Sequence, residues 1–241
     1  MVAARDAFAR HLELLYACHA CPNVAGLPIT GAVRDTRVML VGQAPGPHEA
    51  KHEKPFAYTA GKRLFGWFAD SLGVPEEEFR ERIYIAAVIR CFPGKDAKAG
   101  GDRVPDAEEI ARCGEHLDRE IAILGPDLVI AVGTLAASVM LSVGCGSQPH
   151  RGPAKSRPLH SLATTVGRLH RAERAGRKFD VVVLPHPSGR STWLNKPENA
   201  TLLRRSLELI RKHPAFQSSA KAEVLTTRRT RSGSGCRGRS R

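Results

Sequence analysis

Two polar loops hold the side chains best suited to chemistry. Residues 42–49, GQAPGPHE, contain Gln43 and Glu49, and residues 186–190, HPSGR, begin with His186. A histidine held in a proline-flanked loop can stabilise negative charge that develops on a substrate oxygen, although a histidine that only anchors its loop has the same pattern. The carboxylate of Glu49 can accept a proton or be a solvated loop group, whereas the amide of Gln43 can only orient a water.

Each loop follows a short apolar run that is typical of a buried parallel strand. These runs are residues 37–41 and 179–184, and two more cover residues 83–89 and 127–132. In open α/β sheets, ligands bind in the crevice at the carboxyl ends of the strands. We therefore expect both loops to open on the same crevice.

Helical patterns alternate with these strands. They cover residues 3–16, 63–72, 107–123, 133–142 and 198–212, and Asp106 with Glu109 forms a capping-box pattern before the third of them. This alternation predicts an α/β fold, a three-layer αβα sandwich around a central four-stranded parallel sheet. The segment 143–178 has no sustained period, so we expect an insertion of loops there.

The charge of the chain indicates a polyanionic partner. Its 241 residues carry a formal charge of +13, and seven basic residues and one acidic residue in segment 214–241 supply +6 of it. That excess favours nucleic acid. The segment is poor in apolar residues, so we expect one folded domain over residues 1–213 and a disordered basic tail over 214–241. No apolar run is long enough to span a membrane and no signal peptide is evident, which predicts a cytoplasmic protein without a membrane partner. We also expect a monomer.

Six cysteines without a secretory signal argue against a disulfide scaffold and for metal ligation or plain burial.

Four motifs occur in the order of a known family: GQAPG, PFAYTAGKRLF, RCFPG followed by RVPDAEEIARC, and LPHPSG. Together they resemble the uracil-DNA glycosylase superfamily, in particular its iron–sulfur family 4 and family 5 enzymes from bacteria and archaea. The resemblance covers about residues 15–212.

The resemblance implies that four of the cysteines bind a [4Fe–4S] cluster. Four soft thiolates suit either such a cluster or zinc, and zinc on the same residues is the alternative. Cys145 and Cys236 match nothing in the family. The expected ligands are Cys18, Cys21, Cys91 and Cys113.

The resemblance also assigns the substrate contacts. It implies that Phe56 stacks on the uracil, although a core role would suit a phenylalanine equally, and that His186 donates to uracil O2 as this oxygen becomes anionic. Ser188 and Gly189 match the loop that meets the DNA strand. The other expected base-pocket residues are Gly42, Ala44 and Ala87, and the candidates for phosphate contacts are Lys62, Arg63, Arg90, Lys95, Lys98 and Arg190.

Two positions depart from the family 4 pattern. Gln43 stands where these enzymes have a Glu, and Ala87 stands where they have an Asn that reads the uracil edge. Family 5 enzymes also have an apolar residue at the position of Ala87, but their GLAPA-type first loop differs from GQAPG. These departures leave the range of excised bases open.

The sequence therefore predicts a monofunctional DNA glycosylase for base-excision repair that hydrolyses the N-glycosidic bond of uracil, or of other deaminated bases, and leaves an abasic site. One alternative is a non-catalytic binder of damaged or single-stranded DNA with a structural iron–sulfur cluster. Another is an iron–sulfur protein that serves electron transfer, against which the lack of a second cluster motif counts.

Overall fold

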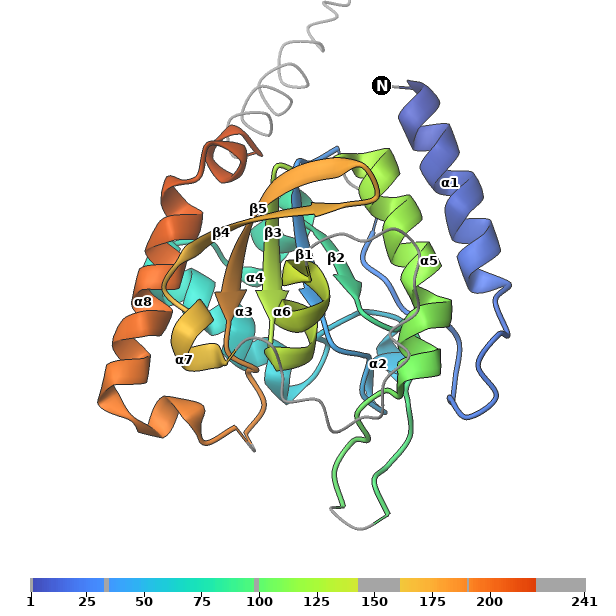
Figure 1. Ribbon diagram of the computed structural model, residues 1–241, viewed down its shortest axis with the longest axis horizontal. Helices are drawn as coiled ribbons and strands as arrows, with labels where there is room; N and C mark the ends of the chain where they lie inside the picture. The colour runs from blue at the N-terminus through green and yellow to red at the C-terminus, as the bar shows by residue number, and fades with distance from the viewer. Residues whose placement is uncertain (1, 33–34, 98–99, 143–160, 190, 220–241) are drawn as a thin grey trace, which may run out of the picture.

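The computed structural model describes residues 2–32, 35–97, 100–142, 161–189 and 191–219 (Figure 1). In chain order its elements are α1 (Val2–Tyr16), β1 (Val38–Gly42), α2 (Glu49–His52), α3 (Thr59–Leu72), α4 (Glu76–Arg82), β2 (Tyr84–Ala87), α5 (Ala107–Leu124), β3 (Leu128–Val132), α6 (Thr134–Leu141), α7 (Leu162–Thr165), β4 (Leu169–Arg174), β5 (Arg177–Leu184), a short 3-10 turn (Trp193–Asn195) and α8 (Pro197–Lys212). None of the described helices is long and apolar enough to cross a membrane.

The strands form one sheet in the order β2-β1-β3-β5-β4. The four predicted strands are parallel, with Gly42 paired to Ala87, Val41 to Ala131, and Val132 to Leu184. Their carboxyl ends therefore lie at one edge of the sheet, as the sequence predicted. β3 separates β1 from β5 at that edge.

A fifth strand corrects the predicted count of four. β4 runs antiparallel to β5 and lies at the edge of the sheet, within the segment that we expected to contain only loops. Its residues LHRAER alternate between exposed and partly buried positions and contain no apolar run. Ala175 and Gly176, which join the two strands, both have positive φ (51° and 69°), the geometry of a tight hairpin turn.

Helices cover both faces of the sheet and make the predicted three layers (Figure 1). Met39 and Val41 of β1 belong to the core beneath α1, α5 and α6, whereas Val38 and Leu40 belong to the core beneath α3, α4 and α8. This alternation is the reason why an uninterrupted apolar run is needed in a strand that is buried on both sides.

The folded domain extends past the expected boundary at residue 213. Residues 214–219 form a further helical turn, and Phe216, only 4% exposed, packs into the core beneath α8 together with Ala215. The charged part of the sequence starts after this turn, so these six residues are not part of a disordered tail. Residues 220–241 lie outside the described part of the chain.

Candidate active site

The first loop is tied to the strand beside it. The backbone oxygen of Gly42 accepts a hydrogen bond from the Val88 N–H at 2.9 Å, and that of Gln43 accepts one from the Ile89 N–H at 3.2 Å. Because Gly42 and Ala87 are register partners, these two expected pocket residues lie side by side. Gln43 and Ala44 follow them and are partly buried.

Phe56 lies against the end of β1. A Cβ atom added to Gly42 would stand 2.9 Å from Phe56 Cζ, and one added to Gly61 would collide with the Phe56 carbonyl. Phe56 has φ of +55°, which is uncommon for a bulky residue, and the Arg80 guanidinium donates to its carbonyl oxygen at 3.2 Å. Such a conformation costs on the order of 1–3 kcal/mol and persists only where its surroundings hold it. The glycines and Arg80 thus fix a half-buried aromatic ring at the crevice.

His186 follows β5 and packs against the end of β3. A Cβ atom at Gly133, which has φ of +89°, would lie 3.2 Å from His186 Cδ2, so the glycine leaves room for the ring. The Ser188 backbone N–H donates to His186 Nδ1 at 3.2 Å. Nδ1 therefore carries no proton, and the ring proton of the neutral imidazole lies on Nε2. Burial lowers the pKa of His186, and the charge of Asp102 opposes this effect.

α3 is tied to the His186 loop. Arg63, in its second turn, donates from Nη1 to the Ser188 backbone oxygen at 3.1 Å. Arg63 was expected to contact DNA phosphate, and it is exposed enough to do so from this position. The neighbouring Lys62 is exposed too, as is Gly189, whereas Arg190 and Lys98 lie outside the described residues.

Glu49 has a defined contact within the first loop. It is 8% exposed, and its Oε2 accepts a hydrogen bond from the Gly46 N–H at 2.9 Å. This bond closes the turn that leads into α2. Next to it, the ring of His48 stacks on Tyr58 with 4.1 Å between centroids.

A second carboxylate, which the sequence analysis missed, reaches the same turn. Asp102 Oδ2 would lie 3.5 Å from a Cβ atom at Gly46. Asp102 belongs to a short hairpin (the 94–103 hairpin), of which the structure describes residues 94–97 and 100–103, and there it pairs with Lys95 through an isolated β-bridge and an ion pair of 2.7 Å. The sequence signal was the lengthened stretch between Cys91 and Cys113.

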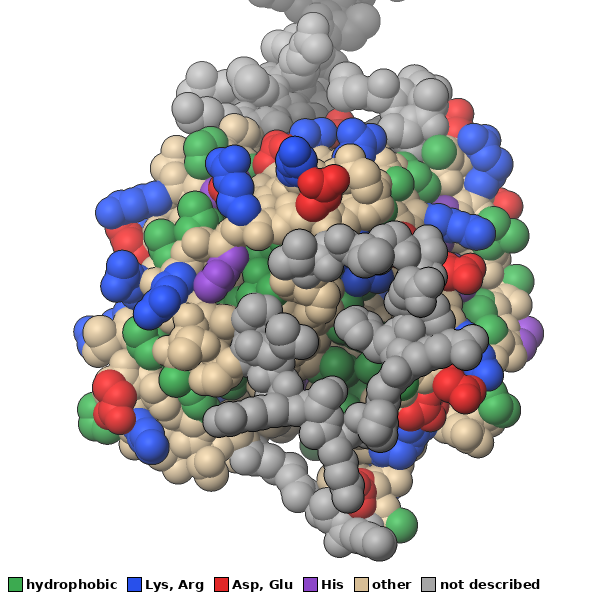
Figure 2. All heavy atoms as spheres, in the orientation of Figure 1, with side chains coloured by type: hydrophobic (Ala, Val, Ile, Leu, Met, Phe, Trp, Pro, Cys, Tyr) green, Lys and Arg blue, Asp and Glu red, His purple; other side chains and the backbone are tan. Residues whose placement is uncertain are grey.

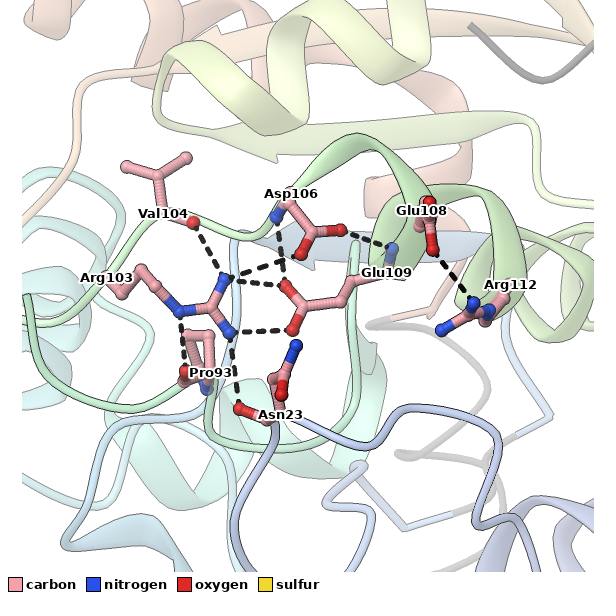
Figure 3. Close-up of polar contacts among 8 residues, drawn as sticks. All are labelled: Asn23, Pro93, Arg103, Val104, Asp106, Glu108, Glu109 and Arg112. Atoms are coloured by element: carbon pink, nitrogen blue, oxygen red, sulfur yellow. Dashed lines mark hydrogen bonds and ion pairs between the residues drawn. The ribbon is translucent and has the colours of Figure 1, made fainter. Parts of the chain in front are cut away.

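Arg103 anchors the 94–103 hairpin to α5 (Figure 3). Its guanidinium donates to both carboxylate oxygens of Glu109, at 2.6 and 2.9 Å, and to the backbone oxygens of Pro93 and Asn23. Glu109 also accepts from the Asp106 N–H while Asp106 accepts from the Glu109 N–H, so the predicted capping box is confirmed. One network therefore holds the hairpin, the start of α5 and the segment after Cys21.

The four predicted cluster ligands line one cavity of about 120 Å³. All four are free thiols, from the segment after α1, the segment after β2 and the middle of α5. Burial is the main reason why the pKa of Cys91 is raised to about 12, and the three neighbouring thiols add to it. Within the described residues, no three or more His, Cys, Asp or Glu side chains form a group ready to hold a metal ion. The donor set itself, four unpaired thiols around one cavity, fits an iron–sulfur cluster.

The expected phosphate contact of Arg90 is wrong, because this side chain is buried. It is 1% exposed, and its guanidinium forms an ion pair with Glu120, which is fully buried in α5. Tyr84 and His11 lie in the same buried cluster. Lys95, another expected contact, pairs with Asp102. Basic and acidic side chains are interspersed over the face shown in Figure 2, so this view singles out no basic patch.

Comparison with known proteins identifies the family. The family model of the uracil DNA glycosylase superfamily matches residues 28–211. A protein named Type-4 uracil-DNA glycosylase from Thermotoga maritima is 35% identical over 129 residues, which cover 52% of this chain and 62% of that protein. Proteins of the same name from Archaeoglobus fulgidus and Pyrobaculum aerophilum are 28% identical over 151 residues (63% and 65%) and 27% identical over 180 residues (73% and 80%).

The chain spans less than two thirds of the length of the first two relatives. A Type-5 uracil-DNA glycosylase from Pyrobaculum aerophilum is similar as well, at 28% identity over 119 residues. The match to the family model includes β1 with its loop, Phe56, and β5 with the His186 loop. The chain therefore belongs to the uracil DNA glycosylase superfamily.

Proposed function

We propose that this protein is a monofunctional DNA glycosylase that hydrolyses the N-glycosidic bond of uracil, or of other deaminated bases, and leaves an abasic site. Membership of the superfamily and the names of the relatives support the reaction class. The observation that carries the proposal is the neutral His186 ring, whose Nε2–H tautomer is fixed by the Ser188 N–H at the edge of the sheet where Phe56 also lies.

The reaction requires the base to leave the helical stack. In our proposal the flipped base stacks on the ring of Phe56, between the first loop and the His186 loop. As the C1′–N bond breaks, its electron pair moves into the base and negative charge builds on O2. A donor already aimed at this oxygen needs no reorganisation, and one such donor is typically worth a factor of about 10²–10³ in rate. His186 Nε2–H is that donor.

Two side chains set the limits of this chemistry. The methyl group of Ala87 cannot hydrogen-bond to the base, so the pocket selects by shape and stacking rather than by reading the uracil edge. A pocket without such a hydrogen bond discriminates weakly between bases of similar shape. We therefore propose that the protein accepts other deaminated bases besides uracil. Gln43 orients a water but does not deprotonate it.

We further propose that Cys18, Cys21, Cys91 and Cys113 hold a [4Fe–4S] cluster. When bound, the cluster supplies a covalent link between three segments that are far apart in the sequence. These segments are the one after α1, the one after β2, and α5. The last two flank the hairpin that carries Asp102, so the cluster would help to shape the DNA-facing edge.

DNA is the proposed macromolecular partner. Lys62 and Arg63 are exposed near the start of α3, and Gly189 is exposed in the His186 loop. We assign phosphate contacts to these residues and to Arg190, because contacts of this kind position a strand without reading its sequence. The basic segment after residue 219 adds charge for non-specific attraction.

The test is the release of free base from oligonucleotides that carry one uracil, hypoxanthine or xanthine, in single-stranded and double-stranded form. We expect uracil release and an abasic product that breaks only on alkaline treatment. Strand cleavage without alkali would contradict the monofunctional assignment. Tight binding to these oligonucleotides without any base release would favour the non-catalytic DNA binder.

A further inference from the structure

We propose that Asp102 is the carboxylate that activates the attacking water in this protein, a role that the amide of Gln43 cannot perform. This inference rests on the proposed glycosylase function and adds to it a catalytic residue from the 94–103 hairpin. None of the four family motifs contains this residue.

The position of Asp102 supports this role. Its Oδ2 lies 3.5 Å from the point where a Cβ atom at Gly46 would stand, so the carboxylate contacts the turn of the loop that begins with Gln43. Its charge also acts on the second loop, because it raises the pKa of His186 against the effect of burial. The carboxylate therefore contacts the first loop and is near enough to the second for its charge to act on His186.

The other carboxylate near Gly46 is less suited to the role. Glu49 is buried, and its Oε2 already accepts the Gly46 N–H. Protonation or movement of Glu49 would break that bond and loosen the turn. The Asp102 side chain is 44% exposed and forms an ion pair with Lys95 on the hairpin surface, so water has access to it.

The hairpin is anchored well enough to position a catalytic group. The Asp96 N–H donates to the Gly101 oxygen at 2.8 Å, and the Arg103 N–H donates to the Gly94 oxygen at 2.9 Å. The side chain of Arg103 then binds Glu109, which is 2% exposed (Figure 3). Asp102 is therefore adjacent to a residue fixed on a buried carboxylate, which is the support that a reactive side chain requires.

The proposed step is a hydrolysis that balances without a further reactant. The water oxygen bonds to C1′ while the C1′–N bond breaks and its electron pair stays with the base. The water proton passes to the Asp102 carboxylate and then to the departing base. The products are the C1′ hydroxyl of the abasic sugar and the neutral free base, and His186 stabilises the anionic base between these events.

The test compares two isosteric variants in single-turnover base release from a uracil oligonucleotide. Asp102→Asn removes the charge and keeps the shape, and we expect a loss of about 10²-fold, in the range for a general base. Asp118→Asn is the matched control, because Asp118 is 46% exposed and also forms an ion pair, with Arg174, but lies on α5. It should retain the parent rate, and Asp102→Glu should recover part of the loss.

A second readout separates catalysis from a structural effect. Among the described residues, the charged groups near His186 are Asp102, which raises its pKa, and Arg63, which binds the Ser188 oxygen. Without the Asp102 charge, the acid limb of the rate profile should move to lower pH, while affinity for an abasic-site duplex stays near the parent value. If Asp102→Asn releases uracil at the rate of Asp118→Asn, the inference is wrong and the glycosylase function stands. If the parent releases no base, both are wrong.

Discussion

The Ser188 backbone N–H donates to His186 Nδ1 at 3.2 Å. This bond decides the tautomer of the histidine, because an accepting Nδ1 leaves the ring proton on Nε2. The Gly133 backbone supports the ring from the end of β3. A loop of five residues thus holds a neutral donor in one orientation, and this is what electrostatic stabilisation of a developing anion requires.

The pH dependence of the reaction should follow His186. Burial lowers its pKa below the ordinary value, so the ring is neutral at pH 7 and binds a proton only in more acidic solution. Protonation would place an N–H against the Ser188 N–H and disturb the loop. We expect the single-turnover rate to be constant near neutral pH and to fall with an apparent pKa below about 6.5, the ordinary value for histidine. His186→Gln keeps a donor without a titrating group, so its residual rate should lack this limb.

The lowered pKa of His186 should also make the stability of the fold depend on pH. The unfolded chain binds a proton at His186 at a higher pH than the folded chain does. The free energy of unfolding should therefore lose a contribution as the pH falls below about 6.5, and the loss should be complete below the pKa of the folded state. Denaturant titrations of the parent and of His186→Gln at several pH values measure this difference. An equal pH dependence in both proteins would contradict it.

We predict that the purified protein is brown, because the four cysteines should bind an iron–sulfur cluster. An iron–sulfur cluster bound to thiolates should give broad visible absorbance and about four iron atoms per chain, and Cys113→Ala should lose both. Cys145→Ala should keep the colour, since Cys145 is not among the predicted ligands. A colourless protein with one zinc ion per chain would contradict the cluster assignment.

The buried pair of Arg90 and Glu120 should be costly to break. Glu120→Ala leaves an uncompensated guanidinium in the core, which typically lowers the free energy of unfolding by about 3–5 kcal/mol. Glu173→Ala removes an exposed ion pair with Lys178 and should change the free energy of unfolding by less than about 1 kcal/mol. Denaturant unfolding of the two variants provides the measurement. Equal effects would show that the buried pair has no special part in stability.

Truncation after residue 219 should weaken DNA binding without changing the choice of base. The removed segment carries seven basic residues and one acidic residue, and neutralised phosphates release counterions. The slope of affinity against salt concentration should therefore become shallower. Truncation after residue 213 is the informative comparison, because it also removes Phe216 from the core and should lower stability. If truncation after residue 219 changed which base is excised, this assignment would be contradicted.

Much of the fold could be predicted from local patterns. Apolar runs of five to seven residues predicted the four parallel strands, because such strands are buried on both faces and their residues leave a continuous signal. The capping box of Asp106 and Glu109 was readable for the same reason, since both partners lie within one turn. β4 was missed because a charged edge strand contains no apolar run, and its tight turn holds a single glycine.

The remaining errors involve contacts between residues that are distant in the sequence. Arg90 follows an apolar run and so was expected at the surface, but its partner Glu120 is thirty residues away. Asp102 lies in a stretch rich in Gly and Lys, which predicts only a loop, and its proximity to Gly46 depends on the anchor formed by Arg103 and Glu109. Such pairings are set by tertiary packing rather than by local propensity.

The most direct measurement is single-turnover release of uracil by the parent, His186→Ala and Gln43→Ala, with affinity for an abasic-site duplex as the control for folding and DNA binding. We predict that His186→Ala lowers the rate by at least about 10²–10³, or roughly 3–4 kcal/mol in the barrier, at nearly unchanged affinity. Gln43→Ala should cost on the order of tenfold, since an amide orients water without deprotonating it. Release by His186→Ala at close to the parent rate, with Gln43→Ala inactive, would contradict the central role of His186.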